Sequence, residues 1–103
     1  MTIYRILRDR NIEAKSIEQA ECNLLENNGS ATESYFTDRE AAEAAYSTAK
    51  SKLDPPKYLG RGLYWFDGIA LEVYVNCDPE EENLKEAALV GDCEGADVEV
   101  RGF

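Results

Sequence analysis

The segment from Leu63 to Val75 constrains the fold more than any other, because two runs of strand-forming residues flank Asp67-Gly68. An Asp-Gly pair is typical of a two-residue type I′ turn, in which both central residues need positive φ. The pattern therefore predicts an antiparallel hairpin over residues 63–75. With Phe66 paired to Ile69, one face would form the core: Tyr64, Phe66, Ile69, Leu71, Val73 and Val75. The opposite face would carry Leu63, Trp65, Ala70, Glu72 and Tyr74.

Three segments carry helix signals. Ser16-Ile17-Glu18-Gln19 has the composition of a capping box and predicts a helix over about residues 16–27. Thr37-Asp38-Arg39-Glu40 has the same composition and opens an alanine-rich segment that Asp54-Pro55-Pro56 terminates. Asp78-Pro79 followed by acidic residues predicts the start of a short third helix.

The remaining apolar runs predict strands. Residues 2–8 form a first strand that ends in a turn at Asp9-Arg10-Asn11, residues 33–36 form a short strand, and residues 96–101 alternate as a half-buried last strand. Together with the hairpin, these runs predict an α+β fold. We expect a small antiparallel sheet of about four to five strands, with two to three helices packed mainly on one face.

The length of the chain limits the number of domains. A chain of 103 residues with 44% apolar residues can build one hydrophobic core, so residues 1–103 are predicted to form a single acidic domain. The longest apolar run, from Ile69 to Val75, is far too short to cross a bilayer, and the first residues do not resemble a signal peptide. We therefore expect a cytoplasmic protein that does not bind membranes.

The sequence contains no histidine. Histidine is the commonest general base and the commonest transition-metal ligand, so its absence favours a protein without enzymatic activity. Asp78, Glu80 and Glu82 have the spacing that opens a calcium-binding loop, but Asn83 stands where an EF-hand needs glycine and Leu89 where it needs glutamate. We predict no cofactor and no dedicated metal site.

The three cysteines, Cys22, Cys77 and Cys93, are an odd number with wide and unequal spacing. This spacing fits neither a paired disulfide framework nor a zinc site. They are therefore predicted to be reduced thiols without a catalytic role.

Acidic residues are concentrated in the C-terminal part of the chain. Residues 62–103 hold eleven acidic and two basic residues, whereas residues 1–61 hold ten acidic and nine basic residues. Alternate residues of a strand lie about 6.6–6.8 Å apart, close to twice the axial rise between phosphates along one strand of a duplex. A surface of this kind can imitate nucleic acid, although such charge runs often serve only solubility. The predicted partner-binding carboxylates are Asp78, Glu80, Glu81, Glu82, Glu86, Asp92, Glu94, Asp97 and Glu99.

A second predicted surface centres on Trp65 and Tyr74. Aromatic residues supply much of the binding energy of protein interfaces, and these two fall on the half-polar face of the predicted hairpin. An alternative is that the alanines of the second helix cover Trp65. If that face is open, the protein is an adaptor or interaction domain that binds a protein partner or forms a homodimer.

In small size, strong acidity and lack of catalytic apparatus the chain resembles phage-encoded inhibitors of bacterial defence, such as anti-CRISPR and anti-restriction proteins. The resemblance implies a non-enzymatic inhibitor that occupies the basic groove of a nucleic-acid-binding protein or nuclease. With a formal charge of −10, the chain itself is not expected to bind nucleic acid directly. The adaptor that binds through the Trp65 face is the alternative.

Overall fold

The structure of the chain is a computed structural model, which describes residues 1–26, 31–77, 83–89 and 93–103. The elements follow in the order β1 (Ile3–Ala14), α1 (Ile17–Glu26), β2 (Thr32–Phe36), α2 (Arg39–Lys50), β3 (Lys57–Gly60), β4 (Leu63–Tyr74), α3 (Leu84–Leu89) and β5 (Ala96–Gly102). The molecule is elongated, with principal extents of 49, 24 and 18 Å.

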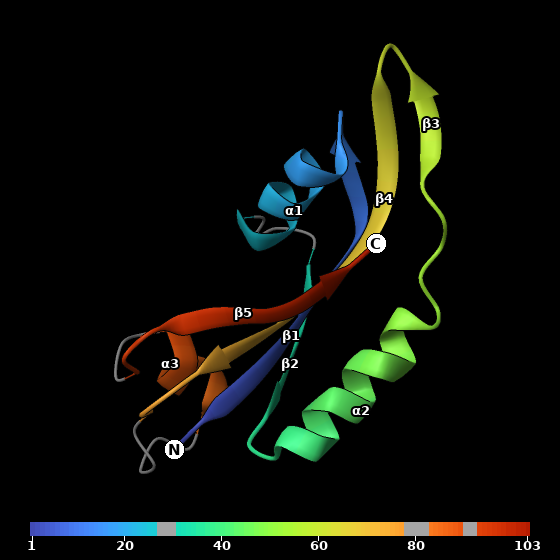
Figure 1. Cartoon of the computed structure of the whole chain (residues 1–103). Coiled ribbons are helices and arrows are strands. Elements are labelled where there is room, and N and C mark those ends of the chain that lie inside the picture. Colours follow the sequence, from blue (N-terminus) through green and yellow to red (C-terminus); the bar gives the residue numbers. More distant parts are fainter. Residues whose placement is uncertain (27–30, 78–82, 90–92) are drawn as a thin grey trace.

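The five strands form one antiparallel sheet (Figure 1). Its order begins β2-β1-β4. The edge of β4 that faces away from β1 pairs with two further strands, β3 and β5. β3 pairs with the first residues of β4, from Leu63 to Trp65, and β5 pairs with the later residues, from Ile69 to Tyr74. The predicted α+β class, with an antiparallel sheet of four to five strands and two to three helices, is confirmed.

Both faces of the central strands are covered. On one face α1 packs on a cluster that includes Leu7, Phe66 and Ala70, and α3 packs near Ile3 and Tyr74. On the other face α2 packs on Tyr4, Ile6, Ile69 and Leu71. Two helices thus share one face, and α2 lies alone on the other (Figure 1).

Helix α1 begins at its predicted cap, whereas α2 and α3 begin later than predicted. Ser16 Oγ accepts a hydrogen bond from the Gln19 N–H at 3.1 Å, and Asp38, rather than Thr37, caps α2 by accepting from the Ala41 N–H at 3.1 Å. α3 begins later than predicted, after Asn83, whose Oδ1 accepts from the Lys85 N–H at 3.0 Å. The predicted cap at Asp78-Pro79 lies outside the described residues.

The prediction of a turn at Asp67-Gly68 is wrong. β4 runs without reversal from Leu63 to Tyr74, so Phe66 and Ile69 point to opposite faces of the sheet. The hairpin turn lies earlier, between β3 and β4, where Gly60, Arg61 and Gly62 all have positive φ. The expected turn at Asp9-Arg10-Asn11 is wrong as well, because β1 continues to Ala14 through an irregularity between Asp9 and Ile12.

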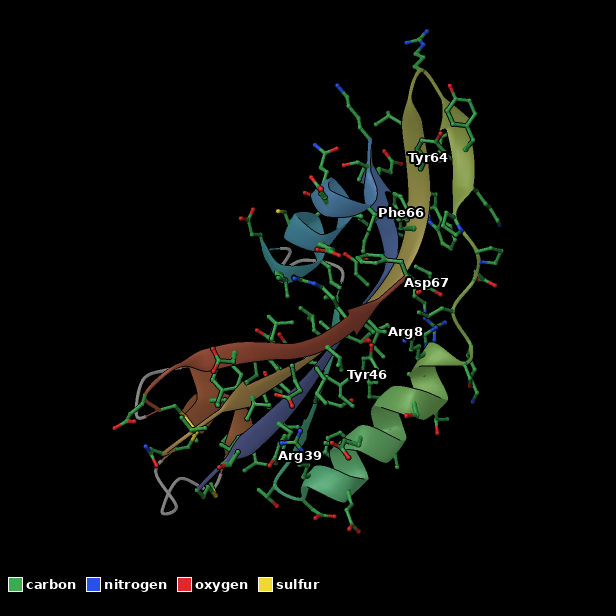
Figure 2. All side chains as sticks on the ribbon, in the orientation of Figure 1. Arg8, Arg39, Tyr46, Tyr64, Phe66 and Asp67 are labelled. Carbon is green, nitrogen blue, oxygen red and sulfur yellow. A yellow bond between two sulfur atoms is a disulfide. The ribbon has the colours of Figure 1, made fainter. Side chains whose placement is uncertain are left out.

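Asp67 and Gly68 have tertiary roles in place of a turn. The buried Asp67 carboxylate accepts from the Arg8 guanidinium at 3.3 Å and from the Asp54 N–H at 3.1 Å (Figure 2). Gly68 pairs with Asp9, and a Cβ atom at position 68 would lie 2.8 Å from the Phe103 ring and 2.9 Å from Ile12 Cδ1. The glycine therefore makes room for the C-terminal ring against the sheet.

Substituting Gly68 with alanine is accordingly expected to push Phe103 away from Phe66, with which it makes an edge-on contact at a ring distance of 5.8 Å. Overpacking of this kind costs about 1–3 kcal/mol of stability. Urea unfolding would measure the loss. The double variant Gly68→Ala/Phe103→Leu should recover part of it, and an unchanged Gly68→Ala midpoint would show that position 68 tolerates a side chain.

Candidate functional site

The acidic residues predicted to bind a partner are only partly described. Asp78, Glu80, Glu81, Glu82 and Asp92 lie outside the described residues. The other four are exposed: Glu86 in α3, Glu94 before β5, and Asp97 and Glu99 within β5.

β5 presents two of these carboxylates, Asp97 and Glu99, on an edge of the sheet. Among the described residues β5 pairs only with β4, so its outer backbone edge has no strand partner there. Val98 and Val100 are also exposed, at 36% and 42% of their surface. The edge therefore combines unpaired peptide groups, two carboxylates and two apolar side chains. An extended peptide can add to such an edge as a further strand.

Glu99 already has a cationic neighbour. Arg39, at the start of α2, donates to Glu99 at 2.6 Å and to Glu43 at 2.9 Å. The hydrogen bonds to Glu99 and then to Glu43 raise the pKa of Arg39. All three side chains are about half exposed, and ion pairs in such surroundings are weak and screened by salt. Asp97 makes no ion pair with a described residue.

Glu94 and Glu86 lie at the same end of the molecule. Glu94 Oε2 accepts from the Asn76 side-chain amide at 2.7 Å, and its backbone N–H donates to the Val75 carbonyl at 3.0 Å. Glu86 lies in the first turn of α3, where a carboxylate favours the helix. Three of the four described carboxylates, Glu86, Glu94 and Glu99, are thus exposed and also support the local structure.

The prediction that Trp65 and Tyr74 share one face does not hold. Since β4 is continuous, the two residues point to opposite faces, and Tyr74 is buried with Ile3 and Ala87. Trp65 is half-buried: its Nε1–H donates to Asn11 at 3.3 Å, and the Lys57 ammonium lies 5.2 Å from its ring centre. The alanines of α2 pack on Tyr4 and Ile6 instead.

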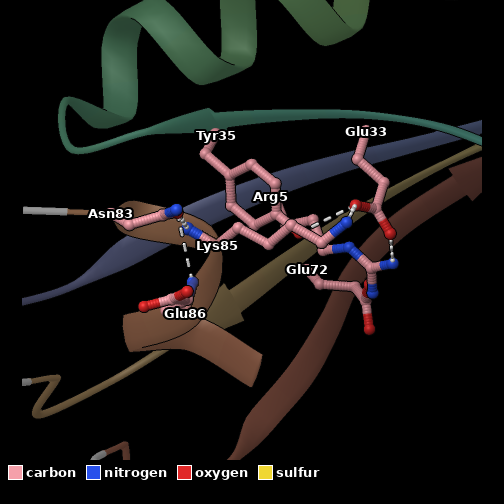
Figure 3. Close-up of polar contacts among 7 residues, drawn as sticks. All are labelled: Arg5, Glu33, Tyr35, Glu72, Asn83, Lys85 and Glu86. Carbon is pink, nitrogen blue, oxygen red and sulfur yellow. Dashed lines mark hydrogen bonds and ion pairs between the residues drawn. The ribbon is translucent and has the colours of Figure 1, made fainter. Parts of the chain in front are cut away.

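A buried ion-pair network surrounds Arg5, and the sequence pattern did not indicate it (Figure 3). The Arg5 guanidinium donates to Glu33 and, at 2.8 Å, to Glu72. Glu33 also accepts from the Tyr35 hydroxyl at 3.1 Å and pairs with Lys85 of α3 at 3.1 Å. The only sequence signal is that Arg5 and Glu72 interrupt otherwise apolar strands, and one sequence does not show that they meet.

Burial and the contacts of the network shift the pKa values of Arg5, Glu33 and Tyr35. Burial acts to lower the pKa of Arg5, but its bond to Glu33 and the charge of Glu72 outweigh burial and raise this pKa. Burial acts to raise the pKa of Glu33, but hydrogen bonds from Lys85 and Arg5 lower it overall. Burial raises the pKa of Tyr35 to about 12. These directions favour a charged Arg5, a charged Glu33 and a protonated Tyr35 at neutral pH.

The prediction of three reduced thiols is wrong for two of them. Cys77 and Cys93 form a disulfide that closes a separation of 16 residues, and Cys22 is free and exposed. Spacing alone could not identify this pair, because the two sulfur atoms meet only after the chain from Cys77 has passed through α3.

In the part of the chain that the structure describes, no group of three or more Cys, Asp or Glu side chains is arranged to hold a metal ion. No helix among the described residues has both the length and the apolar character needed to cross a membrane. Comparison of the chain with protein families, with curated proteins and with solved structures finds no match.

Proposed function

We propose that this chain is a non-enzymatic protein-binding domain that inhibits a nucleic-acid-binding protein by occupying its basic groove. The binding surface is the acidic edge of β5 together with the neighbouring carboxylates of the C-terminal part. The observation that carries the proposal is that Asp97 and Glu99 are exposed on a strand whose outer edge has no partner among the described residues. A phage-type inhibitor of bacterial defence is the biological form that this activity would take.

The charge distribution supports a basic partner. Residues 62–103 carry a net charge of −9 and residues 1–61 a net charge of −1, so attraction is directed to one part of the chain. Complementary charge of this kind accelerates association and makes it depend strongly on salt. Since the Arg39–Glu99 pair is solvent-exposed, a cation of the partner can replace Arg39 at little cost.

Exposed valines supply the second component. Val98 and Val100 lie on the same strand as the two carboxylates, and Leu89 of α3 is exposed as well, at 42%. Burial of such side chains, at about 25 cal/mol per Å² of apolar surface, adds a contribution that does not depend on salt. Charge would therefore set the rate and register of binding, while the apolar contacts and the strand edge hold the complex.

The double variant Asp97→Lys/Glu99→Lys is expected to reduce capture of the partner at least about tenfold, because like charges then face its basic surface. The immobilised protein is incubated with bacterial lysate at about 0.1 M and at about 0.5 M salt, between which screening increases sharply. Nucleic-acid-binding proteins are identified in the eluates. With the captured protein purified, fluorescence anisotropy then tests whether the wild-type chain displaces its nucleic acid.

Glu13→Lys/Glu26→Lys is the matched control, because it makes the same change in net charge at two exposed positions of the N-terminal half. It should retain capture. Equal capture by both double variants, or a complex that nucleic acid does not compete with, would contradict the proposal.

The adaptor remains a second candidate because the β3–β4 hairpin projects from the body of the molecule (Figure 1). It exposes Tyr58 at 63% and Leu59 at 50%, beside the half-buried Trp65. Binding through this surface would survive at about 0.5 M salt and would be lost on Trp65→Ala, so the same capture experiment separates the two functions.

A further inference from the structure

We propose that a pocket between α2 and strands β1 and β2 binds a phosphate-type oxyanion, either free or as a small phosphate monoester. The pocket has a volume of about 210 Å³, and its polar lining consists of Arg8, Arg10, Thr32 and Ser34. It lies at the β2 edge of the sheet, whereas β5 lies beyond β4, so the proposal does not depend on the function proposed for β5.

The strand register brings three of the four polar residues together. Arg8 pairs with Thr32 and Ile6 pairs with Ser34 across the antiparallel β1–β2 ladder. Arg8 therefore lies on the face that α2 covers, and Arg10, in the irregular part of β1 between Asp9 and Ile12, lines the same pocket. The two arginines and the two hydroxyl groups therefore line one wall.

The opposite wall is made by small side chains. Ala45 and Ala49 of α2 face the strands across the pocket, and neither has atoms beyond Cβ to fill it. A volume of about 210 Å³ lies below the range of about 300–1,000 Å³ that drug-sized ligands occupy. The pocket suits a tetrahedral oxyanion with a short organic substituent.

The charge of the lining is positive. It contains two guanidinium groups and no carboxylate. Arg8 is compensated, because its Nη2 lies 3.3 Å from the buried Asp67 carboxylate, but its buried Nε–H has no hydrogen-bond partner within the described structure. Arg10 is exposed and makes no ion pair with any described residue. One positive charge therefore remains without a counter-ion.

The available donors match the chemistry of an oxyanion. Guanidinium groups form charge-assisted, often bidentate hydrogen bonds with phosphate, and hydroxyl groups supply further donors. The Ser34 hydroxyl has no hydrogen-bond partner in the described part of the chain. With the described residues, Thr32 Oγ1 makes only a long contact of 3.4 Å, to the Arg8 carbonyl. Both hydroxyls can turn towards a ligand without loss of a strong internal bond.

The test is a titration of the full chain with inorganic phosphate and, separately, with glycerol 3-phosphate, followed by amide chemical shifts at constant ionic strength. Saturable shifts at residues 6–10, 32–34 and 45–49 are expected, with a dissociation constant on the order of 1 mM. Tighter binding of glycerol 3-phosphate would identify a phosphorylated small molecule as the ligand, and preference for phosphate would identify the free ion.

Arg10→Gln is expected to weaken binding about tenfold, since it removes a charge-assisted bond, and Ser34→Ala is expected to weaken it a few-fold. Both residues are exposed, so the variants should keep the wild-type unfolding midpoint. Arg61→Gln, at the tip of the β3–β4 hairpin, makes the same change in charge away from the pocket and should bind phosphate like the wild type. Equal weakening by Arg61→Gln, wild-type affinity of Arg10→Gln, or shifts that never saturate would overturn the proposal.

Discussion

Substituting Arg5 with methionine is expected to lower the free energy of unfolding by about 3–5 kcal/mol, the largest loss among the variants considered. The Arg5 side chain is only 8% exposed and holds two carboxylates, Glu33 and Glu72, that are themselves largely buried. Without the guanidinium, Glu72 loses its only ion pair among the described residues, and its charge stays in a poorly solvated place. Urea unfolding followed by circular dichroism measures the change.

Arg39→Met is the matched control because Arg39 also binds two carboxylates, Glu43 and Glu99, but on the surface. Exposed pairs contribute little, so this variant should stay close to the wild type. Adding Glu72→Leu to Arg5→Met removes the uncompensated charge and should restore part of the stability. An Arg5→Met protein that unfolds at the same urea concentration as Arg39→Met would show that the buried network contributes no more than a surface pair.

The same network makes the fold sensitive to acid. The pKa of Glu33 is lowered below its ordinary value of 4.5, so the folded state favours the charged carboxylate. This contribution is fully present above the unfolded-state pKa, and it is lost as the pH falls through the lower folded-state pKa. The stability difference between wild type and Arg5→Met should therefore shrink as the pH falls below about 4.5.

Local sequence signals predicted the fold class and the start of α1, but they failed where tertiary contacts decide. Asp67-Gly68 has the composition of a turn, yet Asp67 pairs with Arg8 and Gly68 admits the Phe103 ring. A type I′ turn would lose both contacts. Asp9, predicted to end the first strand, lies opposite Gly68 in the middle of a longer one.

The candidate sites were predictable to different degrees. Strand alternation predicted a half-buried last strand, and this is wrong, because Val98 and Val100 are exposed together with Asp97 and Glu99. The burial of Tyr74 could not be predicted, because the expected turn would have placed Tyr74 on the same face as Trp65. The pocket beside Arg8 and Arg10 depends on the β1–β2 register and on where α2 crosses, and both are long-range properties.

Substituting both Cys77 and Cys93 with alanine is expected to lower the stability by about 3 kcal/mol, because the bridge closes a separation of 16 residues and restricts the unfolded chain. For a domain of this size the melting temperature should fall by roughly 10–20 °C. The bridge also connects the end of β4 to the segment that enters β5, so its loss should weaken any binding through the β5 edge. Thermal unfolding with and without a reductant measures the effect.

Cys22→Ala separates the bridge from general thiol effects. Cys22 is exposed and free, so its removal should leave the melting temperature unchanged and leave the response to reductant intact.

The bridge and the predicted cytoplasmic location lead to different expectations about the redox state of Cys77 and Cys93. Disulfides persist in oxidising compartments and are rare in the cytosol. In a reducing compartment the protein would have to fold without this contribution, and it would then behave like the double alanine variant. If alkylation of the native protein labels all three cysteines under oxidising conditions, the pairing is wrong and the original expectation of reduced thiols is restored.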